Sequence, residues 1–225
     1  MLKRYQAPKS YIDDINLDDF KYTQYEKGDK QRTPKFDNIL MLPELTELKK
    51  FVMDSAKDFL DTVLEMKYEE FFITESWINI STKGDNQRLH NHSNSILSGV
   101  HYLKTEENHP PLIFKKQSQQ TEPFMSIREH HKKNYDTMSF PCTQDTMVVF
   151  NSYMYHMHFK NKIDTDRISL SWNGLVNFAT NSDNLNTLSF DRTAYTRPCV
   201  FIKKETWLLW AVSYTHLTLP TICSV

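Results

Sequence analysis

One stretch near the start of the chain has helical periodicity, and every later apolar segment is short and rich in β-branched and aromatic residues. Between Pro43 and about Lys67, apolar residues recur at intervals of three and four, which predicts a helix with one buried face. Proline favours the first helical turn and supports this start. The buried positions are predicted to be Leu45, Leu48, Val52, Ala56, Phe59, Leu60 and Val63.

The β-type segments follow one another without a helical pattern between them. Their residues are those that strands favour, and they span 71–80, 95–103, 112–114, 146–150 and 167–172. This order favours an antiparallel barrel or sandwich over a doubly wound parallel sheet. The fold expected from the pattern is therefore mainly β with one N-terminal helix.

The remaining segments suggest how the domain is bounded. Residues 1–42 have no sustained period and are expected to form an irregular N-terminal segment. Residues 115–140 are polar and predict a long loop of the kind that often covers a site. We expect a single domain over 43–205, with its core in 70–175.

The last residues of the chain have a separate explanation. The run from Val212 to Thr221 looks like translated sequencing-adapter read-through. We therefore expect residues 211–225 to be a non-native tail without function; a genuine C-terminal strand is the alternative.

Composition narrows the function classes. A net charge of −1 over 225 residues gives no general attraction to nucleic acid or to an anionic membrane. The four glycines form no phosphate-binding or dinucleotide fingerprint. Three widely spaced cysteines argue against a zinc ribbon or a disulfide framework and suit a reducing compartment. With no signal-peptide pattern and no stretch near the roughly 20 apolar residues of a membrane span, we expect a cytoplasmic enzyme.

Two pairs of histidines have HxH spacing, His90 with His92 and His156 with His158. Residues two apart on a strand point to the same face, so such a pair can aim two imidazoles at one metal ion. His156, just after the strand at 146–150, is the candidate third ligand. Three ligands on one side of an iron leave the opposite side open to co-substrate and O₂. Pairs at this spacing also occur by chance on strand surfaces.

Arg167 and Ser169 open the next strand, eleven residues after His156. An arginine and a serine on one strand face can hold a carboxylate through an ion pair and a hydroxyl hydrogen bond. That arrangement suits the distal carboxylate of 2-oxoglutarate. The alternative is an arginine at a strand edge that pairs with Asp164 or Asp166, although the order HxH, His, Arg-x-Ser argues against coincidence.

At these positions the chain resembles a family of 2-oxoglutarate/Fe(II) oxygenases that is frequent in phage and bacterial genomes and related to the prolyl hydroxylases. The resemblance covers roughly residues 70–175. The segments that carry it are Ser76–Asn79, Gln87–Leu103, Phe150–His156 and Asp166–Asn173.

The resemblance implies a double-stranded β-helix of the jelly-roll or cupin-like type, with the N-terminal helix packed on its sheet. It places the metal histidines at His90 and His156, the co-substrate arginine at Arg167, and a carboxylate-binding tyrosine at Tyr102. His92 departs from the aspartate or glutamate that most of the wider superfamily has. Three neutral imidazoles leave Fe(II) with its full charge, which the dianionic 2-oxoglutarate can neutralise. His92 as an outer residue is the alternative.

These inferences combine into one expectation: a non-haem, 2-oxoglutarate-dependent dioxygenase that hydroxylates a further substrate and releases succinate and CO₂. Fe(II) would be held by His90, His92 and His156, and 2-oxoglutarate by Arg167, Ser169 and Tyr102.

Two other functions stay open. The first is a cupin-like three-histidine metalloenzyme without 2-oxoglutarate, to which His158 could contribute. Cupins usually add a glutamate soon after HxH, and residues 93–101 contain no acid. The second is a catalytically silent barrel that serves as a phage structural or interaction module.

Other polar and aromatic residues receive weaker expectations. His158 is expected to be exposed at the barrel rim, and His101 to be structural because it points away from Tyr102. Trp77 and Trp172 are expected in the core. Asn79 is expected to face the cavity, and the charged run 128–133 to lie in a solvated loop.

Overall fold

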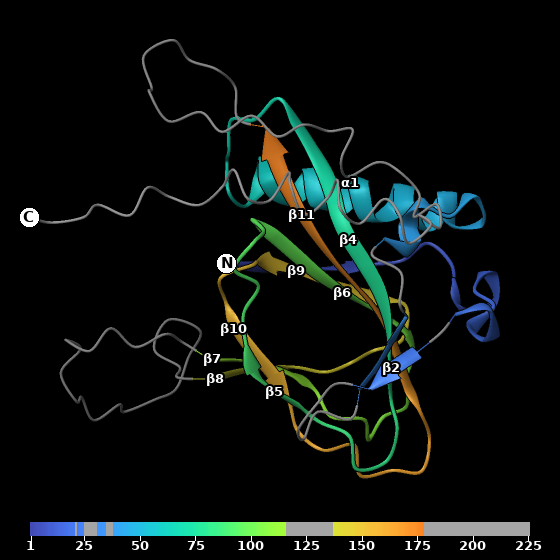
Figure 1. Cartoon of the computed structure of the whole chain (residues 1–225). Helices are drawn as coiled ribbons and strands as arrows, with labels where there is room; N and C mark the ends of the chain where they lie inside the picture. The colour runs from blue at the N-terminus through green and yellow to red at the C-terminus, as the bar shows by residue number, and fades with distance from the viewer. Residues whose placement is uncertain (21, 25–30, 35–37, 116–136, 178–225) are drawn as a thin grey trace, which may run out of the picture.

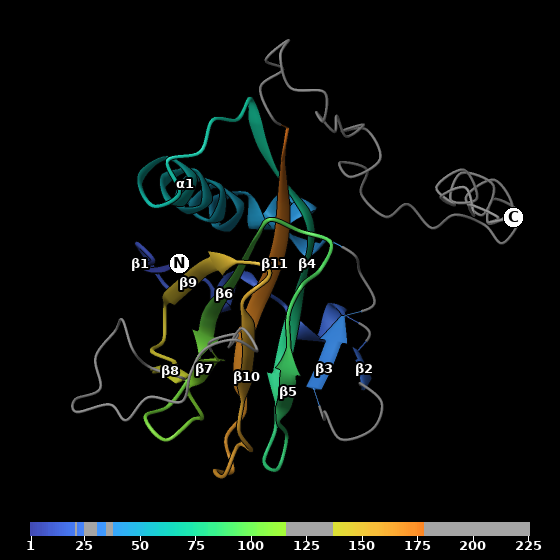
Figure 2. The ribbon, with the colours of Figure 1, turned by 90° about the vertical axis from the view of Figure 1, so that its left-hand side faces the viewer.

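The computed structural model of the protein describes residues 1–20, 22–24, 31–34, 38–115 and 137–177. Two antiparallel sheets face each other, and one long helix covers the outer face of the larger sheet (Figure 1). Figure 2 shows the small sheet from its own side, with β5 and β10 in front of the large sheet. The expected mainly-β architecture with one N-terminal helix is confirmed.

Seven strands form the large sheet in the order β1-β9-β6-β11-β4-β3-β2. They are β1 (Leu2–Gln6), β2 (Tyr22–Gln24), β3 (Gln31–Pro34), β4 (Glu70–Ser81), β6 (Leu97–Lys104), β9 (Thr146–Asn151) and β11 (Arg167–Asn177). The small sheet has the order β5-β10-β7-β8. It contains β5 (Gln87–His90), β7 (Leu112–Lys115), β8 (Thr137–Phe140) and β10 (Tyr155–His158).

The predicted helix is present as a 3-10 turn over Pro43–Leu45 followed by α1 (Thr46–Thr62). Its buried face carries the predicted positions Leu45, Leu48, Val52, Ala56, Phe59 and Leu60. The helix ends five residues before Lys67, because the amides of Val63 and Leu64 both donate to the Phe59 carbonyl and Glu65 adopts a positive φ.

Strand β11 shows how one sequence serves both faces of the large sheet. Ile168, Leu170 and Trp172 belong to the core beneath α1. The alternating residues are all polar and buried, and they face the small sheet: Arg167, Ser169, Ser171 and Asn173. A second, smaller apolar cluster lies on this inner side and is made of Tyr102, Leu112, Phe114, Cys142, Val148 and Phe150.

The core beneath α1 is closely packed around Trp172. Its indole lies against the backbone of Gly99, its cross-strand partner on β6. A Cβ atom placed on Gly99 would lie 2.3 Å from the indole. Glycine is therefore required here by the neighbouring side chain and not by a backbone conformation.

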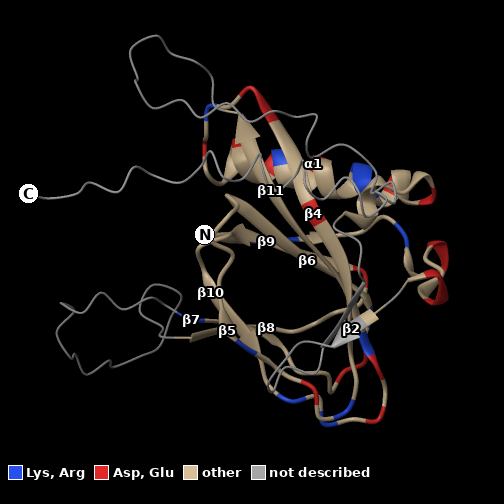
Figure 3. Cartoon of the chain, viewed as in Figure 1, with Lys and Arg blue, Asp and Glu red and all other residues tan. Residues whose placement is uncertain are grey.

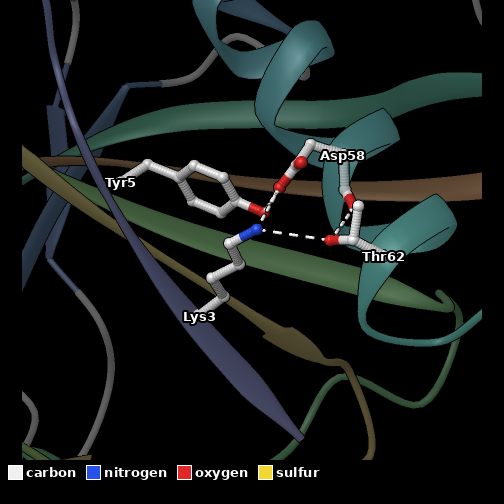
Figure 4. Close-up of polar contacts among 4 residues, drawn as sticks. All are labelled: Lys3, Tyr5, Asp58 and Thr62. Carbon is white, nitrogen blue, oxygen red and sulfur yellow. Dashed lines mark hydrogen bonds and ion pairs between the residues drawn. The ribbon is translucent and has the colours of Figure 1, made fainter.

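The N-terminal part of the chain differs from the irregular segment expected over 1–42. Strand β1 pairs with β9 along five residues at one edge of the large sheet, and β3 pairs with β4 at the other side. A polar cluster anchors β1 to the helix: Lys3 Nζ and Tyr5 Oη both donate to Asp58, at 2.5 and 2.6 Å (Figure 4). The hydrogen-bond partners of β1 and β3 come from distant strands and from α1. The sequence of residues 1–42 alone therefore does not predict these strands.

Three strands of the small sheet were not predicted. β5, β8 and β10 each span only four residues, and their sequences lack an uninterrupted apolar pattern. β8 occupies the end of the predicted polar loop over 115–140. Most of that loop, the charged run 128–133, the boundary at residue 205 and the tail at 211–225 lie outside the described residues.

Charged residues lie mainly on α1, the 3-10 turns and the connecting loops, whereas the strands carry few of them (Figure 3). Among the described residues, no helix has the length and apolar character needed to cross a membrane.

Candidate active site

Three histidines meet between the sheets. His90 ends β5 and is the register partner of His156 on β10, and their ring centroids are 4.2 Å apart. His92 completes the group, with ring centroids 5.2 Å from His90 and 5.1 Å from His156. One nitrogen of each ring lies within 4.8 Å of the others. The structure therefore brings together the three predicted metal-binding residues.

The strand argument explains only part of this convergence. Strand β5 ends at His90, so His92 lies in the following loop and not on the same strand face. The amide of His92 donates to the carbonyl of Ser152 at 2.9 Å, which holds the loop beside β10. The pairing of this loop with the β9–β10 connection, rather than strand alternation, directs the imidazole of His92.

Hydrogen bonds to main-chain carbonyls determine which ring nitrogen of His90 and of His156 can bind a metal ion. Nδ1 of His90 lies 2.8 Å from the Arg88 carbonyl, and Nδ1 of His156 lies 2.9 Å from the Met154 carbonyl. A carbonyl only accepts, so Nδ1 carries the hydrogen and Nε2 has the lone pair. The side-chain nitrogen of Gln87 lies 3.2 Å from Nε2 of His90.

The donor set fits a metal ion. The Nε2 atoms of His92 and His156 are 3.3 Å apart. Two nitrogens bound to one metal at about 2.1 Å lie about 3.0 to 3.4 Å apart, for bond angles between about 90° and about 109°. Burial, with a smaller effect of nearby His90, lowers the pKa of His156 to about 3 and that of His92 to about 4. Both rings are therefore neutral near pH 7, which is the form that binds metals.

A buried cluster of one arginine, one serine and one tyrosine lies on the inner face of the large sheet. Arg167, Ser169 and Tyr102 are all buried, and Ser169 is the cross-strand partner of Tyr102. Nη1 of Arg167 donates to the Pro110 carbonyl at 3.0 Å. Nε of Arg167 and the hydroxyl of Tyr102 have no hydrogen-bond partner among the described residues. Because unsatisfied buried donors are costly, this pair fits a bound carboxylate.

The alternative reading of Arg167 as a strand-edge residue is wrong. Strand β11 lies inside the large sheet, between β6 and β4. Asp164 pairs with Lys83, and the described residues include no ion pair of Arg167 with Asp164 or Asp166. Burial also raises the pKa of Tyr102 above its ordinary value, so its hydroxyl stays protonated and able to donate.

His158 is not exposed at the rim, as the sequence analysis expected, but almost fully buried. Burial, together with the charge of Arg167 and a smaller effect of His90, lowers its pKa to about 3. Its Nδ1 lies 2.9 Å from the Phe159 carbonyl. The bend between His156 and His158 in the pairing with β5 accompanies this inward position. His158 is therefore close enough to both Arg167 and His90 for their charges to act on it.

The tryptophans behave differently from each other. Trp172 is fully buried beneath α1, as expected. Trp77 is only partly buried, and its ring stacks beside His92 at 6.1 Å and 23°, so its placement in the core was wrong. Asn79 is buried on the inner face as expected, accepting from Trp77 Nε1 and donating to Ser171 Oγ.

His101 is buried on the opposite, helix-facing side of β6. Its ring packs against Phe51 and Tyr11, with centroids 5.6 and 6.0 Å away. The expected structural role agrees with this position. Sequence reasoning missed three inner residues, Glu75, Gln87 and Asn173; for Asn173 the two-residue period of β11 was an available signal.

Comparison with known proteins agrees with this arrangement. Residues 75–173 match the family model described as "Putative 2OG-Fe(II) oxygenase". The matched segment contains all the candidate site residues listed above. No curated protein matches the chain in sequence.

Solved structures show the fold. A prolyl-4-hydroxylase from Pseudomonas putida is 13% identical with a TM-score of 0.52, over 76% of this chain and 91% of that one. HygX from Streptomyces hygroscopicus, with nickel, 2-oxoglutarate and hygromycin B bound, is 10% identical with a TM-score of 0.53, over 77% and 82%. The epimerase SnoN from nogalamycin biosynthesis, described as α-ketoglutarate-dependent, is 9% identical with a TM-score of 0.51, over 68% and 66%.

These similarities confirm the double-stranded β-helix, with its two facing antiparallel sheets. The segment 75–173, which contains the three-histidine group and the buried arginine, is similar to the 2OG-Fe(II) oxygenases, a family of oxidoreductases.

Proposed function

We propose that this protein is an Fe(II)- and 2-oxoglutarate-dependent dioxygenase that hydroxylates a further substrate. One observation carries the proposal: a three-histidine group and a buried arginine without a described counter-ion face the same space between the two sheets. The first suits a metal ion and the second suits the far carboxylate of a dicarboxylate.

His90, His92 and His156 are the proposed iron ligands. His92 and His156 are neutral at pH 7, so no proton must be removed from either ring before a metal binds. Three neutral ligands leave the ion's positive charge uncompensated, and the dianionic co-substrate supplies the compensation.

Arg167, Ser169 and Tyr102 are proposed to hold the co-substrate's far carboxylate. The guanidinium supplies the charge and Tyr102 a hydroxyl donor, while cross-strand pairing sets Ser169 beside Tyr102. The apolar residues Leu112, Phe114, Val148 and Phe150 line the same side of the sheets and keep water from this end of the pocket.

When iron and 2-oxoglutarate are bound, they supply O₂ activation coupled to decarboxylation, which yields succinate and CO₂. The protein's own contribution is placement: β5 and the loop after it, together with β10 and β11, hold the ligands and the arginine. Trp77, partly exposed beside His92, is positioned to border the space for the substrate. We place the reaction in the cytoplasm, because the widely spaced cysteines suit a reducing compartment.

The cupin-like alternative does not account for the buried, unsatisfied donors of Arg167 and Tyr102, and a silent barrel does not account for three converging imidazoles. Both observations favour the 2-oxoglutarate-dependent enzyme.

The test is an anaerobic titration of the full chain with Fe(II) and then with 2-oxoglutarate, in which the visible charge-transfer band of the chelated keto acid is measured. We expect a saturable band that is absent in His156→Ala and needs much more 2-oxoglutarate in Arg167→Ala. Iron binding without a band would instead favour the cupin-like enzyme, and absence of iron binding the silent barrel.

A further inference from the structure

A buried amide connects the loop that carries His92 to the large sheet. We propose that Asn173 is a positioning residue that holds the imidazole of His92 in the metal-binding group. Glu75 and Ser98 are proposed to set the orientation of its amide. This inference rests on the proposed function, because it assigns His92 to the metal.

The sheet register places the three residues side by side. On β11, Asn173 is the cross-strand partner of Glu75 on β4 and of Ser98 on β6. Asn173 and Ser98 are buried, whereas Glu75 is exposed. Asn173 therefore presents a buried amide on β11, six residues after Arg167.

The contacts of Asn173 fix which way its amide points. Its Nδ2 donates to the carboxylate of Glu75. Its Oδ1 accepts from the hydroxyl of Ser98 at 2.6 Å. A carboxylate accepts only, so the nitrogen must face Glu75 and the oxygen must face inward.

The same network reaches His92 by two routes. Through the side chains, Asn173 lies close enough to the imidazole of His92 for its amide oxygen to act on the ring as a hydrogen-bond acceptor. Through the backbone, the hydroxyl of Ser98 lies 2.8 Å from that of Ser152, and the Ser152 carbonyl accepts from the amide of His92. Both the ring and the main chain of His92 are thus tied to one cluster of polar residues.

This arrangement gives all three histidines the same kind of support. His90 and His156 are each held at Nδ1 by a main-chain carbonyl within two residues. Since Nε2 of His92 faces His156, the inward Oδ1 of Asn173 is the oxygen available to Nδ1 of His92. Partners of this kind fix the tautomer and the ring orientation of a metal-binding histidine. His92 lies beyond the end of β5 and so depends on a side chain for this support.

The role of Glu75 is orientation rather than charge. Its carboxylate is exposed, and water screens charges at the surface. What it supplies is an acceptor that keeps the amide of Asn173 from flipping. A glutamine at this position retains an acceptor, whereas an alanine does not.

The experiment measures Co(II) binding to the full chain by anaerobic absorption titration, so it needs neither substrate nor turnover. We expect Asn173→Ala to weaken Co(II) binding about 10- to 100-fold. Because Glu75 is exposed, Glu75→Ala does not endanger the fold, and we expect it to weaken binding about threefold to tenfold. Glu75→Gln should bind as the unaltered chain does.

Two controls separate positioning from general damage. Asn79→Ala removes another buried inner-face asparagine, one that bonds Ser171 and Trp77, and should leave Co(II) binding unchanged. In a double-mutant cycle, Asn173→Ala should have little further effect once His92 is alanine, because the two changes act through one ligand.

The outcomes are distinguishable. Normal Co(II) binding by both Asn173→Ala and Glu75→Ala overturns the role of Asn173 and leaves the proposed function intact. Additive losses in the double-mutant cycle also overturn it. Failure of the unaltered chain to bind Co(II) overturns the three-histidine centre itself, and this inference with it.

Discussion

The guanidinium carbon of Arg167 lies 5.9 Å from the ring centre of Tyr102, and each side chain retains a buried donor without a described partner. Both residues come from the middle of the large sheet, on adjacent strands. A pocket with a fixed cation and a fixed hydroxyl donor is preorganised for a carboxylate, because neither group must be reoriented when the anion binds.

The first prediction concerns this pair. Arg167→Ala should raise the Kd for 2-oxoglutarate about 10- to 100-fold, because a hydrogen bond to a charged group contributes about 1.5–3 kcal/mol. Tyr102→Phe should raise it less, about threefold to tenfold, since it removes one neutral donor. Titration of the Fe(II) protein with 2-oxoglutarate gives both values. The matched control is Tyr153→Phe at an exposed tyrosine, and equal affinities in all three variants would contradict the pocket assignment.

The second prediction separates the two histidines of β10. His156→Ala should abolish Fe(II) binding, because it removes a ligand. His158→Ala should retain iron but weaken 2-oxoglutarate binding about tenfold, because it removes a buried ring close to Arg167. Iron content after desalting and the 2-oxoglutarate titration are the two measurements. Loss of iron in His158→Ala would instead make His158 a ligand.

The third prediction is a pH dependence of stability that originates at His101. Burial lowers its pKa from 6.5 to about 4, and neither ring nitrogen has a hydrogen-bond partner among the described residues. The folded protein thus holds the neutral ring, while the unfolded chain binds a proton below pH 6.5. The free energy of unfolding is therefore unaffected by His101 above pH 6.5. It falls by about 3 kcal/mol in total as the pH drops towards 4.

Urea unfolding of the metal-free protein at several pH values tests this contribution. In His101→Phe, the fall in the free energy of unfolding between pH 6.5 and 4 should be smaller by about 3 kcal/mol. A phenyl ring keeps the contacts with Phe51 and Tyr11 and does not titrate. His92, His156 and His158 have lowered pKa values of the same sign, so part of the slope should persist. An unchanged slope in His101→Phe would show that folding does not lower the pKa of His101.

The fourth prediction concerns packing beneath α1. Gly99→Ala should lower the free energy of unfolding by about 1–3 kcal/mol, because its Cβ would overlap the indole of Trp172. In the background of Trp172→Leu the same change should cost less, since the overlapping ring is absent. Urea unfolding of the four proteins gives the coupling. Additive losses would mean that the two residues do not compete for the same space.

The pattern of the sequence determined the helix, the main strands and the chemistry of the site. The three- and four-residue period between Pro43 and Lys67 predicts α1, and the two-residue alternation in 167–172 separates an apolar face from a polar one. These features are local, since a helix or strand buries whichever face its own residues make apolar. The resemblance of four short segments to an oxygenase family added the order of the candidate ligands.

Tertiary structure alone decided which of the polar residues share a site. Register across β4, β11 and β6 brings Glu75, Asn173 and Ser98 together, although they are far apart along the chain. The pairing of distant strands also buries His158, which the sequence predicted at the rim. It leaves Trp77, which the sequence predicted in the core, partly exposed. Side-chain alternation says that a residue faces one side of a sheet, but what covers that side depends on the pairing of distant strands.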